Sequence, residues 1–351
     1  MSSRIVSLKN FDAFRDVISA YRLPRIIFTA LDLELFTAMG TRPWSISALA
    51  KELRVSERGL DILCRNLASA GVLTKQRQIY RNGPVAATTL NAKSPDYRRG
   101  YINLIRDQWT DWGKLTESVL TGRPVEDDTP PDDPAYRQEF SWAMHHRSID
   151  VAPAVVAQVN LKDARTLLDL GGGPGTYALE FLRRNPTLRA TVADRAPALD
   201  VAREIAASVK HGRRLSYQPL DFLKDEISSR YDVIWFSNVL HIYSPEDNQR
   251  LFQKMANALN PGGRVLIQDA FLVDPDGLWP QETNLFAVTM LLFTEEGNTY
   301  SLEETTTWLR KAGFHRVRPI PLKKGTGDWE HGLLEATLAE RRRESRARRS
   351  Q

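Results

Sequence analysis

The stretch from Leu167 to Thr176, with the sequence LLDLGGGPGT, constrains the fold of this 351-residue chain more than any other. It is an apolar, strand-like run followed by four glycines within five positions, and a helix is expected to begin near Tyr177. Glycine is favoured where the backbone takes positive φ or where a ligand approaches the main chain closely. A helix that starts after such a turn offers free N–H groups to a polar or anionic ligand. The stretch therefore predicts a cofactor loop between a strand and a helix.

The spacing of the glycines distinguishes between two kinds of cofactor. The dinucleotide fingerprint G-x-G-x-x-G/A fails here, because Thr176 stands at its last position. The observed form is D-x-G-G-G-x-G, which begins at Asp169 and includes Gly171, Gly173 and Gly175. This form resembles the cofactor loop of class I S-adenosylmethionine (SAM) methyltransferases. Asp194 ends the next strand-like run, where a carboxylate can accept hydrogen bonds from both hydroxyls of a ribose.

From residue 166 onward, strand-like and helix-like segments alternate, which predicts an α/β domain with a doubly wound, Rossmann-like parallel sheet. The turn Pro261-Gly262-Gly263 is expected to open the fifth strand. Ligands of such sheets bind beyond the carboxyl ends of the strands, which selects the glycine loop, Asp194, Asp221-Phe222 and the segment 237–243. The seven expected strands are 166–170, 189–194, 213–218, 231–237, 263–269, 315–321 and 332–338.

Residues 44–82 have the pattern of a winged helix. Ser45 or Ser47 can cap a first helix and Ser56 a second one, and 72–74 with 78–80 would form the wing. A helix-turn-helix of this kind raises the hypothesis of DNA binding. The second helix, however, carries Glu57 and Asp61 among its arginines, and a helix that reads a DNA groove is usually more basic. We therefore expect a structural or dimerisation role and no nucleic-acid partner.

The domain organisation follows from these patterns. Residues 11–40 contain two strongly apolar amphipathic helices, which we interpret as subunit-interface helices of a homodimer. The predicted domains are a winged-helix dimerisation domain (1–95), a helical connection that contributes to the substrate pocket (96–160), a SAM-binding methyltransferase domain (161–340) and a basic, disordered tail (341–351).

The net charge of +5 belongs to this tail, which holds six arginines and one acid, so that residues 1–340 have no net charge. A single cysteine, Cys64, excludes an internal disulfide and a cysteine-rich metal site. His145 and His146 are neighbours that would point about 100° apart on a helix, so we assign them to solvent or packing rather than to a metal. The apolar runs are too short for a bilayer, and the N-terminus has no apolar signal core, which predicts a cytoplasmic protein without a membrane partner.

The run SNVLHIYS, from Ser237 to Ser244, resembles the V-L-H-D-W-S segment of the plant-type O-methyltransferases. Bacterial natural-product enzymes and the animal acetylserotonin branch resemble the chain too, and the likeness extends from about residue 10 to 340. It implies a SAM cofactor, an N-terminal winged-helix dimerisation domain and His241 as the catalytic base. The chemistry agrees, because methyl transfer to a hydroxyl needs a positioned acceptor and a base that works near neutral pH.

The resemblance also assigns the groups around the base and the cofactor. Asp269 would orient His241, although the plant enzymes have glutamate there, and the family's second glutamate is replaced by Thr299. The aspartate of H-D-W has become Ile242, so one acid near the cofactor is lost. Asp221 and Phe222 would hold the adenine, and Ser237 stands where the plant enzymes often have a lysine near the methionine carboxylate. The expected cofactor residues are Asp169, Gly171, Gly173, Gly175, Asp194, Asp221, Phe222 and Ser237.

We expect an apolar acceptor pocket that includes Met144, Met290 and Phe293. The predicted function is SAM-dependent O-methylation of a small, hydroxylated, aromatic metabolite. Two alternatives stay open: methylation of carbon or nitrogen on the same scaffold, and a SAM-sensing DNA-binding regulator. The sequence does not identify the acceptor, the group that replaces the acid at Thr299, or the role of the arginine-rich tail.

Overall fold

The computed structural model describes residues 6–126, 133–322 and 332–339. Its contacts divide the chain into two compact units between Arg106 and Asp107. This division lies within helix α7 (Arg99–Trp112), whereas the sequence set limits at residues 95 and 160, which remain predictions of domain organisation. The tail 341–351 lies outside the described residues.

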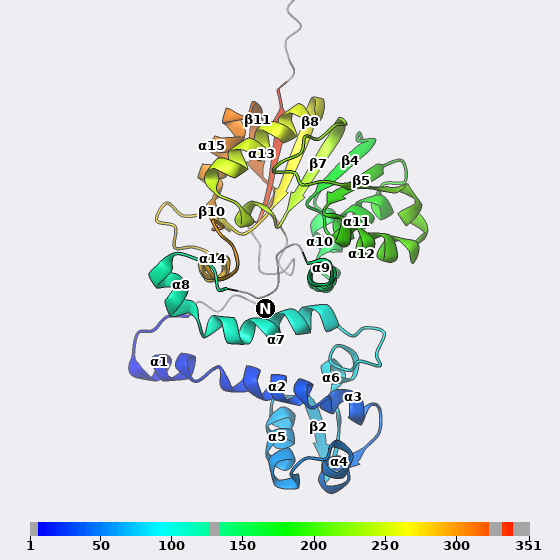
Figure 1. Ribbon diagram of the computed structural model, residues 1–351, viewed down its shortest axis with the longest axis vertical. Helices are drawn as coiled ribbons and strands as arrows, with labels where there is room; N and C mark the ends of the chain where they lie inside the picture. The colour runs from blue at the N-terminus through cyan, green and yellow to red at the C-terminus, as the bar shows by residue number, and fades with distance from the viewer. Residues whose placement is uncertain (1–5, 127–132, 323–331, 340–351) are drawn as a thin grey trace, which may run out of the picture. The chain divides into compact units, whose positions relative to one another are not determined.

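The N-terminal unit consists mainly of short helices around a three-stranded sheet of order β1-β3-β2 (Figure 1). Its strands pair antiparallel throughout, with β3 in the centre. The elements are α1 (Phe11–Ile18), α2 (Arg22–Asp32), α3 (Leu35–Met39), β1 (Trp44–Ser45), α4 (Ile46–Leu53), α5 (Glu57–Ser69), β2 (Leu73–Gln76), β3 (Ile79–Asn82), α6 (Pro84–Thr88) and the first part of α7.

The predicted winged helix is confirmed in detail. The Ser45 hydroxyl accepts the Ala48 N–H at 3.3 Å and caps α4, and the Ser56 hydroxyl accepts the Gly59 N–H at 3.2 Å and caps α5. Cys64 is fully buried between α5 and the rest of this core. Burial, together with the nearby charge of Asp61, raises the pKa of the Cys64 thiol to about 12, so the thiol stays neutral and unreactive.

The second unit is built on a seven-stranded sheet of order β11-β12-β8-β7-β4-β5-β6. All seven strands were predicted, although β6 begins later than expected because Lys210–Arg214 forms a 3-10 turn. β8 begins earlier, at Leu259, so the Pro-Gly-Gly turn lies within the strand, where its pairing with β7 shifts register. The strands are β4 (Thr166–Leu170), β5 (Arg189–Asp194), β6 (Leu215–Pro219), β7 (Tyr231–Ser237), β8 (Leu259–Gln268), β11 (Phe314–Pro319) and β12 (Leu333–Leu338).

The expectation of a wholly parallel sheet is wrong at one edge. β12 pairs antiparallel with both β8 and β11, and only β6, β5, β4, β7 and β8 form a parallel array. The reason is the connection: parallel neighbours need a crossover of a dozen or more residues, usually a helix, and the sequence contains no helical pattern between 321 and 332. A short return strand therefore runs back against its neighbours.

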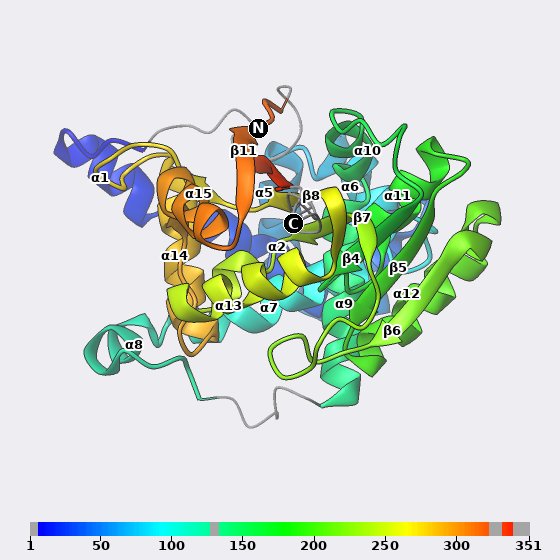
Figure 2. The ribbon, with the colours of Figure 1, turned by 90° about the horizontal axis from the view of Figure 1, so that it is seen from above.

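Helices cover both faces of this sheet. Figure 2 shows α13 (Pro245–Asn257) and α15 (Leu302–Lys311) on one face, and α11 (Thr176–Arg184) and α12 (Ala196–Ala207) on the other. Each face buries its own apolar cluster against the central strands β4, β7 and β8. The remaining elements are α8 (Leu115–Thr121), α9 (Pro134–Ser148), α10 (Ala152–Val156), α14 (Gln281–Phe293) and the small pair β9 (Phe271–Leu272) and β10 (Tyr300–Ser301).

Candidate active site

The glycine loop joins β4 to α11 and leaves no room for larger residues. Gly171, Gly173 and Gly175 have φ values of +70°, +49° and +69°, a region that side chains with a Cβ rarely adopt. A Cβ on Gly172 would lie 2.7 Å from both carboxyl oxygens of Asp169. The four glycines therefore let the main chain fold tightly over Asp169, at the carboxyl end of β4.

Asp169 is an almost fully buried acid, with 2% of its surface exposed. Burial raises the pKa of its carboxyl to about 7; a hydrogen bond from the Ala178 backbone opposes this, and the charge of Asp194 adds to it. Its Oδ2 atom is buried without a hydrogen-bond partner among the described residues. Such an oxygen is costly unless a donor or a cation reaches it.

Asp194 connects the end of β5 to the glycine loop. Its Oδ2 accepts the Gly173 N–H and its Oδ1 accepts the Arg195 N–H, each at 2.7 Å. The pKa of Asp194 lies above its ordinary value, because burial raises it more than these two hydrogen bonds lower it. Each carboxylate oxygen has a second lone pair, so Asp194 can still accept the hydroxyls of a ribose.

Asp221 and Phe222 follow β6, one strand further along the sheet. Burial alone would raise the pKa of Asp221, but hydrogen bonding to Lys224 and the charge of Arg195 bring it below its ordinary value. The Phe222 ring lies against the glycine loop, 3.5 Å from the position of a Cβ on Gly171. It also packs edge-on against Tyr243, with 5.9 Å between the ring centroids. The fold thus brings Phe222 to the glycine loop and Asp221 to Arg195, the residue after Asp194, and their contact with an adenine stays a prediction.

Ser237 ends β7 and is held by its neighbours. Its hydroxyl donates to Gln268 Oε1 at 3.2 Å and accepts from Asn238 Nδ2 at 2.9 Å. Asn238 itself has a φ of +56°.

His241 and Asp269 form a buried pair. His241 lies in a 3-10 turn, η2 (Leu240–Ile242), between β7 and α13, and Asp269 follows the last residue of β8. His241 Nδ1 lies 2.7 Å from Asp269 Oδ1, which also accepts the Ala270 N–H at 2.7 Å. Because a carboxylate only accepts, Nδ1 carries the hydrogen of this bond. The other ring nitrogen, Nε2, is then the basic atom of His241.

An aromatic side chain that the sequence analysis missed packs on this histidine. The Phe286 ring meets the His241 ring edge-on, with 4.7 Å between the centroids. Phe286 lies on α14 one turn before Met290 and two turns before Phe293, so the three side chains share one face of the helix. Met290 is buried and Phe293 half-buried, and Met144 lies half-buried on α9.

The structure also gives His145 a definite place. Its Nδ1 lies 2.9 Å from the hydroxyl of Thr176, the first residue of α11 after the glycine loop. The ring packs against Trp142 and His146, at 5.7 and 5.8 Å between centroids. These are packing contacts, and the assignment of both histidines to packing rather than to a metal stays a prediction. The described ranges hold no cluster of three or more acidic, histidine or cysteine side chains that could bind a metal ion.

The segment after α14 reaches the histidine with its backbone rather than with an acid. The Asn298 N–H donates to the His241 carbonyl at 2.9 Å. Thr299, which replaces the family's second glutamate, is buried, and its N–H donates to Asn298 Oδ1 at 2.8 Å. Glu295 and Glu296 have exposed side chains, which argues against either one as a buried substitute.

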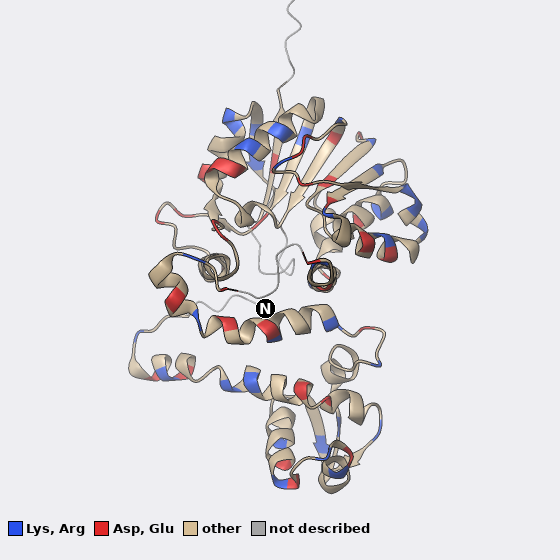
Figure 3. Cartoon of the chain, viewed as in Figure 1, with Lys and Arg blue, Asp and Glu red and all other residues tan. Residues whose placement is uncertain are grey.

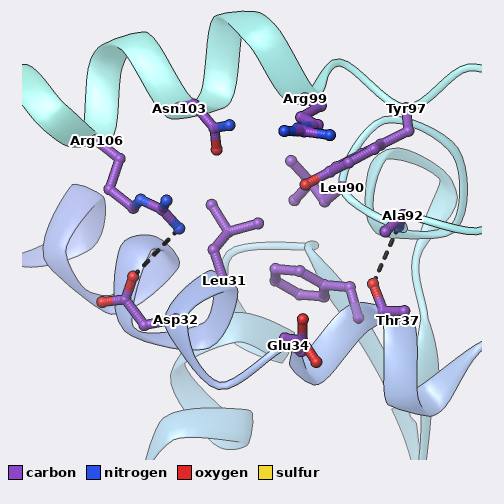
Figure 4. A pocket seen from close by; sticks show the side chains of 11 residues that line it. Leu31, Asp32, Glu34, Thr37, Leu90, Ala92, Tyr97, Arg99, Asn103 and Arg106 are labelled. Carbon is purple, nitrogen blue, oxygen red and sulfur yellow. Dashed lines mark hydrogen bonds and ion pairs between the residues drawn. The ribbon is translucent and has the colours of Figure 1, made fainter. Parts of the chain in front are cut away.

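A cavity of about 260 Å³ lies in the N-terminal unit (Figure 4). Its wall carries charges of both signs, and Asp32 lies 3.6 Å from Arg106. At one side of the cavity, the Thr37 hydroxyl accepts the Ala92 N–H at 3.0 Å. None of the predicted cofactor, catalytic or acceptor residues lines this cavity.

None of the helices in the described ranges combines the length and apolar character that crossing a bilayer requires.

The mixed sheet, the glycine loop with its acids and the nearby histidine–aspartate pair define a class I methyltransferase fold.

Comparison with known proteins places the chain within this class. A family model described as the O-methyltransferase domain matches residues 122–315, and one described as the O-methyltransferase dimerisation domain matches residues 16–92. The chain belongs to the O-methyltransferase family, and it is a SAM-dependent O-methyltransferase.

Individual relatives agree over most of the chain. It is 31% identical to the 3-hydroxy-5-methyl-1-naphthoate 3-O-methyltransferase of Streptomyces sahachiroi, over 83% of this chain and 86% of that enzyme. It is 27% identical to the L-tyrosine C(3)-methyltransferase of Streptomyces lavendulae, over 82% of each chain. The solved structure of the S-adenosylmethionine-dependent methyltransferase SibL in its apo form has a TM-score of 0.68 and 27% identity, and the match covers 94% of this chain and 100% of that one.

Proposed function

We propose that His241 is the general base of an O-methylation whose acceptor is a hydroxylated aromatic metabolite. The observation that carries the proposal is the buried His241–Asp269 pair, with 2.7 Å between Nδ1 and Oδ1. Asp269 orients the ring and stabilises its protonated form, and Nε2 removes the proton of the acceptor hydroxyl. Bound SAM supplies a methyl group already activated on a sulfonium sulfur. The chain's own task is to hold the acceptor oxygen in line and to accept its proton.

The residues around the glycine loop fit SAM. The unpartnered Oδ2 of Asp169 suits the ammonium group of the methionine moiety, because a cation supplies the partner that the buried acid lacks. Asp194 would accept the ribose hydroxyls, and Asp221 with Phe222 would hold the adenine by hydrogen bonding and stacking. Ser237 lies at the same edge, and its hydroxyl would contact the methionine carboxylate by turning its one hydrogen away from Gln268 Oε1.

An aromatic acceptor suits the surroundings of the base. Phe286 already packs on His241, and the predicted residues Met290 and Phe293 continue the same stripe of α14. The relative from Streptomyces sahachiroi acts, by its name, on a hydroxynaphthoate. We therefore propose a fused or single aromatic ring with a free hydroxyl as the acceptor, with Met144 completing its pocket.

The test combines binding and turnover. Calorimetry should show binding of SAM and S-adenosylhomocysteine and no binding of NAD⁺. A screen of hydroxylated aromatic metabolites with methyl-labelled SAM should then give a product labelled on oxygen. Binding of NAD⁺ instead of SAM, or a purified enzyme whose products all carry the methyl group on carbon or nitrogen, would contradict the proposal.

One relative, the L-tyrosine C(3)-methyltransferase, methylates carbon by its name and shares 27% identity over most of the chain, so the atom that receives the methyl group should be determined directly. For an already nucleophilic carbon, positioning could suffice and His241 would be dispensable. The position of the label in the product, determined by NMR, separates the two reactions.

A DNA-binding regulator is disfavoured by the charges on α5. Figure 3 shows acidic and basic positions on the same helix. Its acids are Glu57 and Asp61, and Arg65 lies 3.1 Å from Asp61. This pairing removes positive charge from the helix that would enter a groove. We propose that the protein has no nucleic-acid partner, and sequence-specific retardation of DNA at physiological salt would overturn this.

The cytoplasmic location also stays a prediction.

We propose that the N-terminal unit forms the homodimer interface, as the match to a dimerisation domain suggests. α1 exposes Phe11, Phe14 and Ile18 by 72%, 45% and 61%, an apolar stripe that is costly in water. The double variant Phe11→Asp and Phe14→Asp should shift the protein from dimer to monomer in sedimentation equilibrium at micromolar concentration. Leu278→Asp, in an equally exposed loop of the other unit, is the control and should remain dimeric. A wild-type protein that is monomeric at high concentration would disprove the interface.

A further inference from the structure

We propose that Asn248 is a positioning residue for the catalytic histidine. It lies on α13, seven residues after His241, and it fastens the backbone of the turn on both sides of the histidine. The inference rests on the proposed role of His241 and extends it to a residue that no sequence motif indicates.

A single side-chain amide makes both contacts. Asn248 Nδ2 donates to the Leu240 carbonyl at 2.9 Å and to the Tyr243 carbonyl at 3.0 Å. Asn248 has no exposed surface. An amide nitrogen has two hydrogens, so this one group donates to both carbonyls at once.

The turn depends on such outside contacts because it has few of its own. η2 has three residues, and its internal bonds are Ile242 N–H to the Val239 carbonyl at 3.0 Å and a long one from the Tyr243 N–H to the Leu240 carbonyl at 3.5 Å. Short 3-10 turns have poor hydrogen-bond geometry, so they are easily displaced. The position of His241 is therefore set by what holds η2 from outside.

The segment after α14 also holds this turn. The Asn298 N–H donates to the His241 carbonyl at 2.9 Å, and the Tyr300 hydroxyl donates to the Tyr243 carbonyl at 2.5 Å. A Cβ on Gly297 would lie 2.5 Å from the His241 carbonyl oxygen, so this contact is close. Together with Asn248, these groups hold the backbone while Asp269 holds the ring.

A purely structural role explains Asn248 less well. The start of α13 is already capped by the Ser244 hydroxyl, which accepts the Asp247 N–H at 3.2 Å. Asn248 Oδ1 is buried without a partner among the described residues, and an apolar side chain would avoid that cost. The buried Asn248 amide thus destabilises the core, while its hydrogen bonds stabilise the turn η2.

The experiment compares Asn248→Leu with Gln249→Leu, the matched control. Gln249 is the next residue on the same helix, and its amide donates, among the residues that the structure describes, to the Pro245 carbonyl of its own first turn. Asn248→Leu should lower kcat about 10- to 100-fold, because small displacements of a catalytic group have effects of that order. The Kd for SAM should stay within about twofold of wild type. Gln249→Leu should keep wild-type values for both constants.

A second variant and a double variant complete the test. Asn248→Ser keeps one donor and should have an intermediate kcat, and it replaces Asn248→Leu if the latter does not fold. In a His241→Ala background, the Asn248 substitution should cause no further loss of kcat, because it acts through the histidine. A wild-type kcat in Asn248→Leu, or additive losses in the double variant, would overturn the inference. If His241→Ala itself kept full activity, the proposed function would fail instead, so the two failures are distinguishable.

Discussion

Replacing His241 by alanine is expected to lower kcat about 10³-fold, because a positioned general base contributes roughly 10² to 10⁴ to a rate. Binding of SAM should change little, since the described contacts of the ring are with Asp269 and Phe286. Stopped or continuous assays with labelled SAM give kcat, and calorimetry gives the Kd for the cofactor. Imidazole added to the variant should restore part of the lost rate by taking the place of the missing ring.

The partner acid provides the internal check on this result. Asp269→Asn should lower kcat about 10²-fold, because the amide can donate to Nδ1 and so favours the wrong tautomer of the histidine. The double variant should be no slower than His241→Ala, since the two residues act as a unit. His211→Ala is the matched control, in a 3-10 turn at the other end of the sheet, and should keep wild-type kcat. A His241→Ala enzyme with wild-type kcat would exclude the base assignment.

The second large effect is expected at Asp169, where stability and cofactor binding should change in opposite directions. The folded-state pKa of about 7 lies well above the ordinary value of 3.8. Between about pH 4 and pH 7, the folded protein therefore keeps a proton that the unfolded chain releases. The contribution of this group to stability falls as pH rises through that window and is constant above it.

Asp169→Asn removes this loss because an amide has no proton to release. At pH 8 and without cofactor, the free energy of unfolding of the variant should exceed that of wild type by about 2 kcal/mol. This is only a part of the free energy that corresponds to the whole pKa shift of Asp169, which sets the upper limit. Near pH 4 the two proteins should be equally stable. The affinity for SAM should fall at least tenfold, because the ammonium group loses its carboxylate. Urea unfolding at both pH values checks the predicted stabilities, and calorimetry with SAM checks the predicted loss of affinity.

Asp221→Asn gives the contrasting control. The pKa of Asp221 lies below its ordinary value, so this carboxylate stabilises the fold above that ordinary value, and its amide variant should be less stable at pH 8. A less stable Asp169→Asn protein, or one that binds SAM as tightly as wild type, would contradict the assignment of Asp169 to the ammonium group.

Local structure could be predicted from the sequence at positions where a residue type has a single physical use. Four glycines beside Asp169 required a tight turn, and Ser45 and Ser56 marked helix starts that the structure confirms. The seven strands could be predicted because buried strands are short apolar runs between turn signals. His241 and Asp269 were found by resemblance, and the fold brings them within 2.7 Å.

The features that could not be predicted depend on tertiary contacts, which no local sequence pattern contains. The direction of β12 was missed because alternation of strands and helices was taken to continue to the end of the chain. Phe286 lies on a helix that is apolar all round, so periodicity could not select the residue that meets His241. Asn248 is one polar residue on an amphipathic helix, and only the fold shows that its amide faces the turn.

The insertion of β12 between β8 and β11 has a consequence for how the enzyme is made. The strands that carry the glycine loop, Asp194 and Asp221 are complete once β6 has been synthesised, but β8 gains its outer neighbour only when the last strand arrives. The Asp269 N–H donates to the Gly332 carbonyl, directly before that strand. The cofactor half of the sheet can thus assemble during synthesis, while the edge that holds the histidine's carboxylate closes after nearly all of the described chain has left the ribosome.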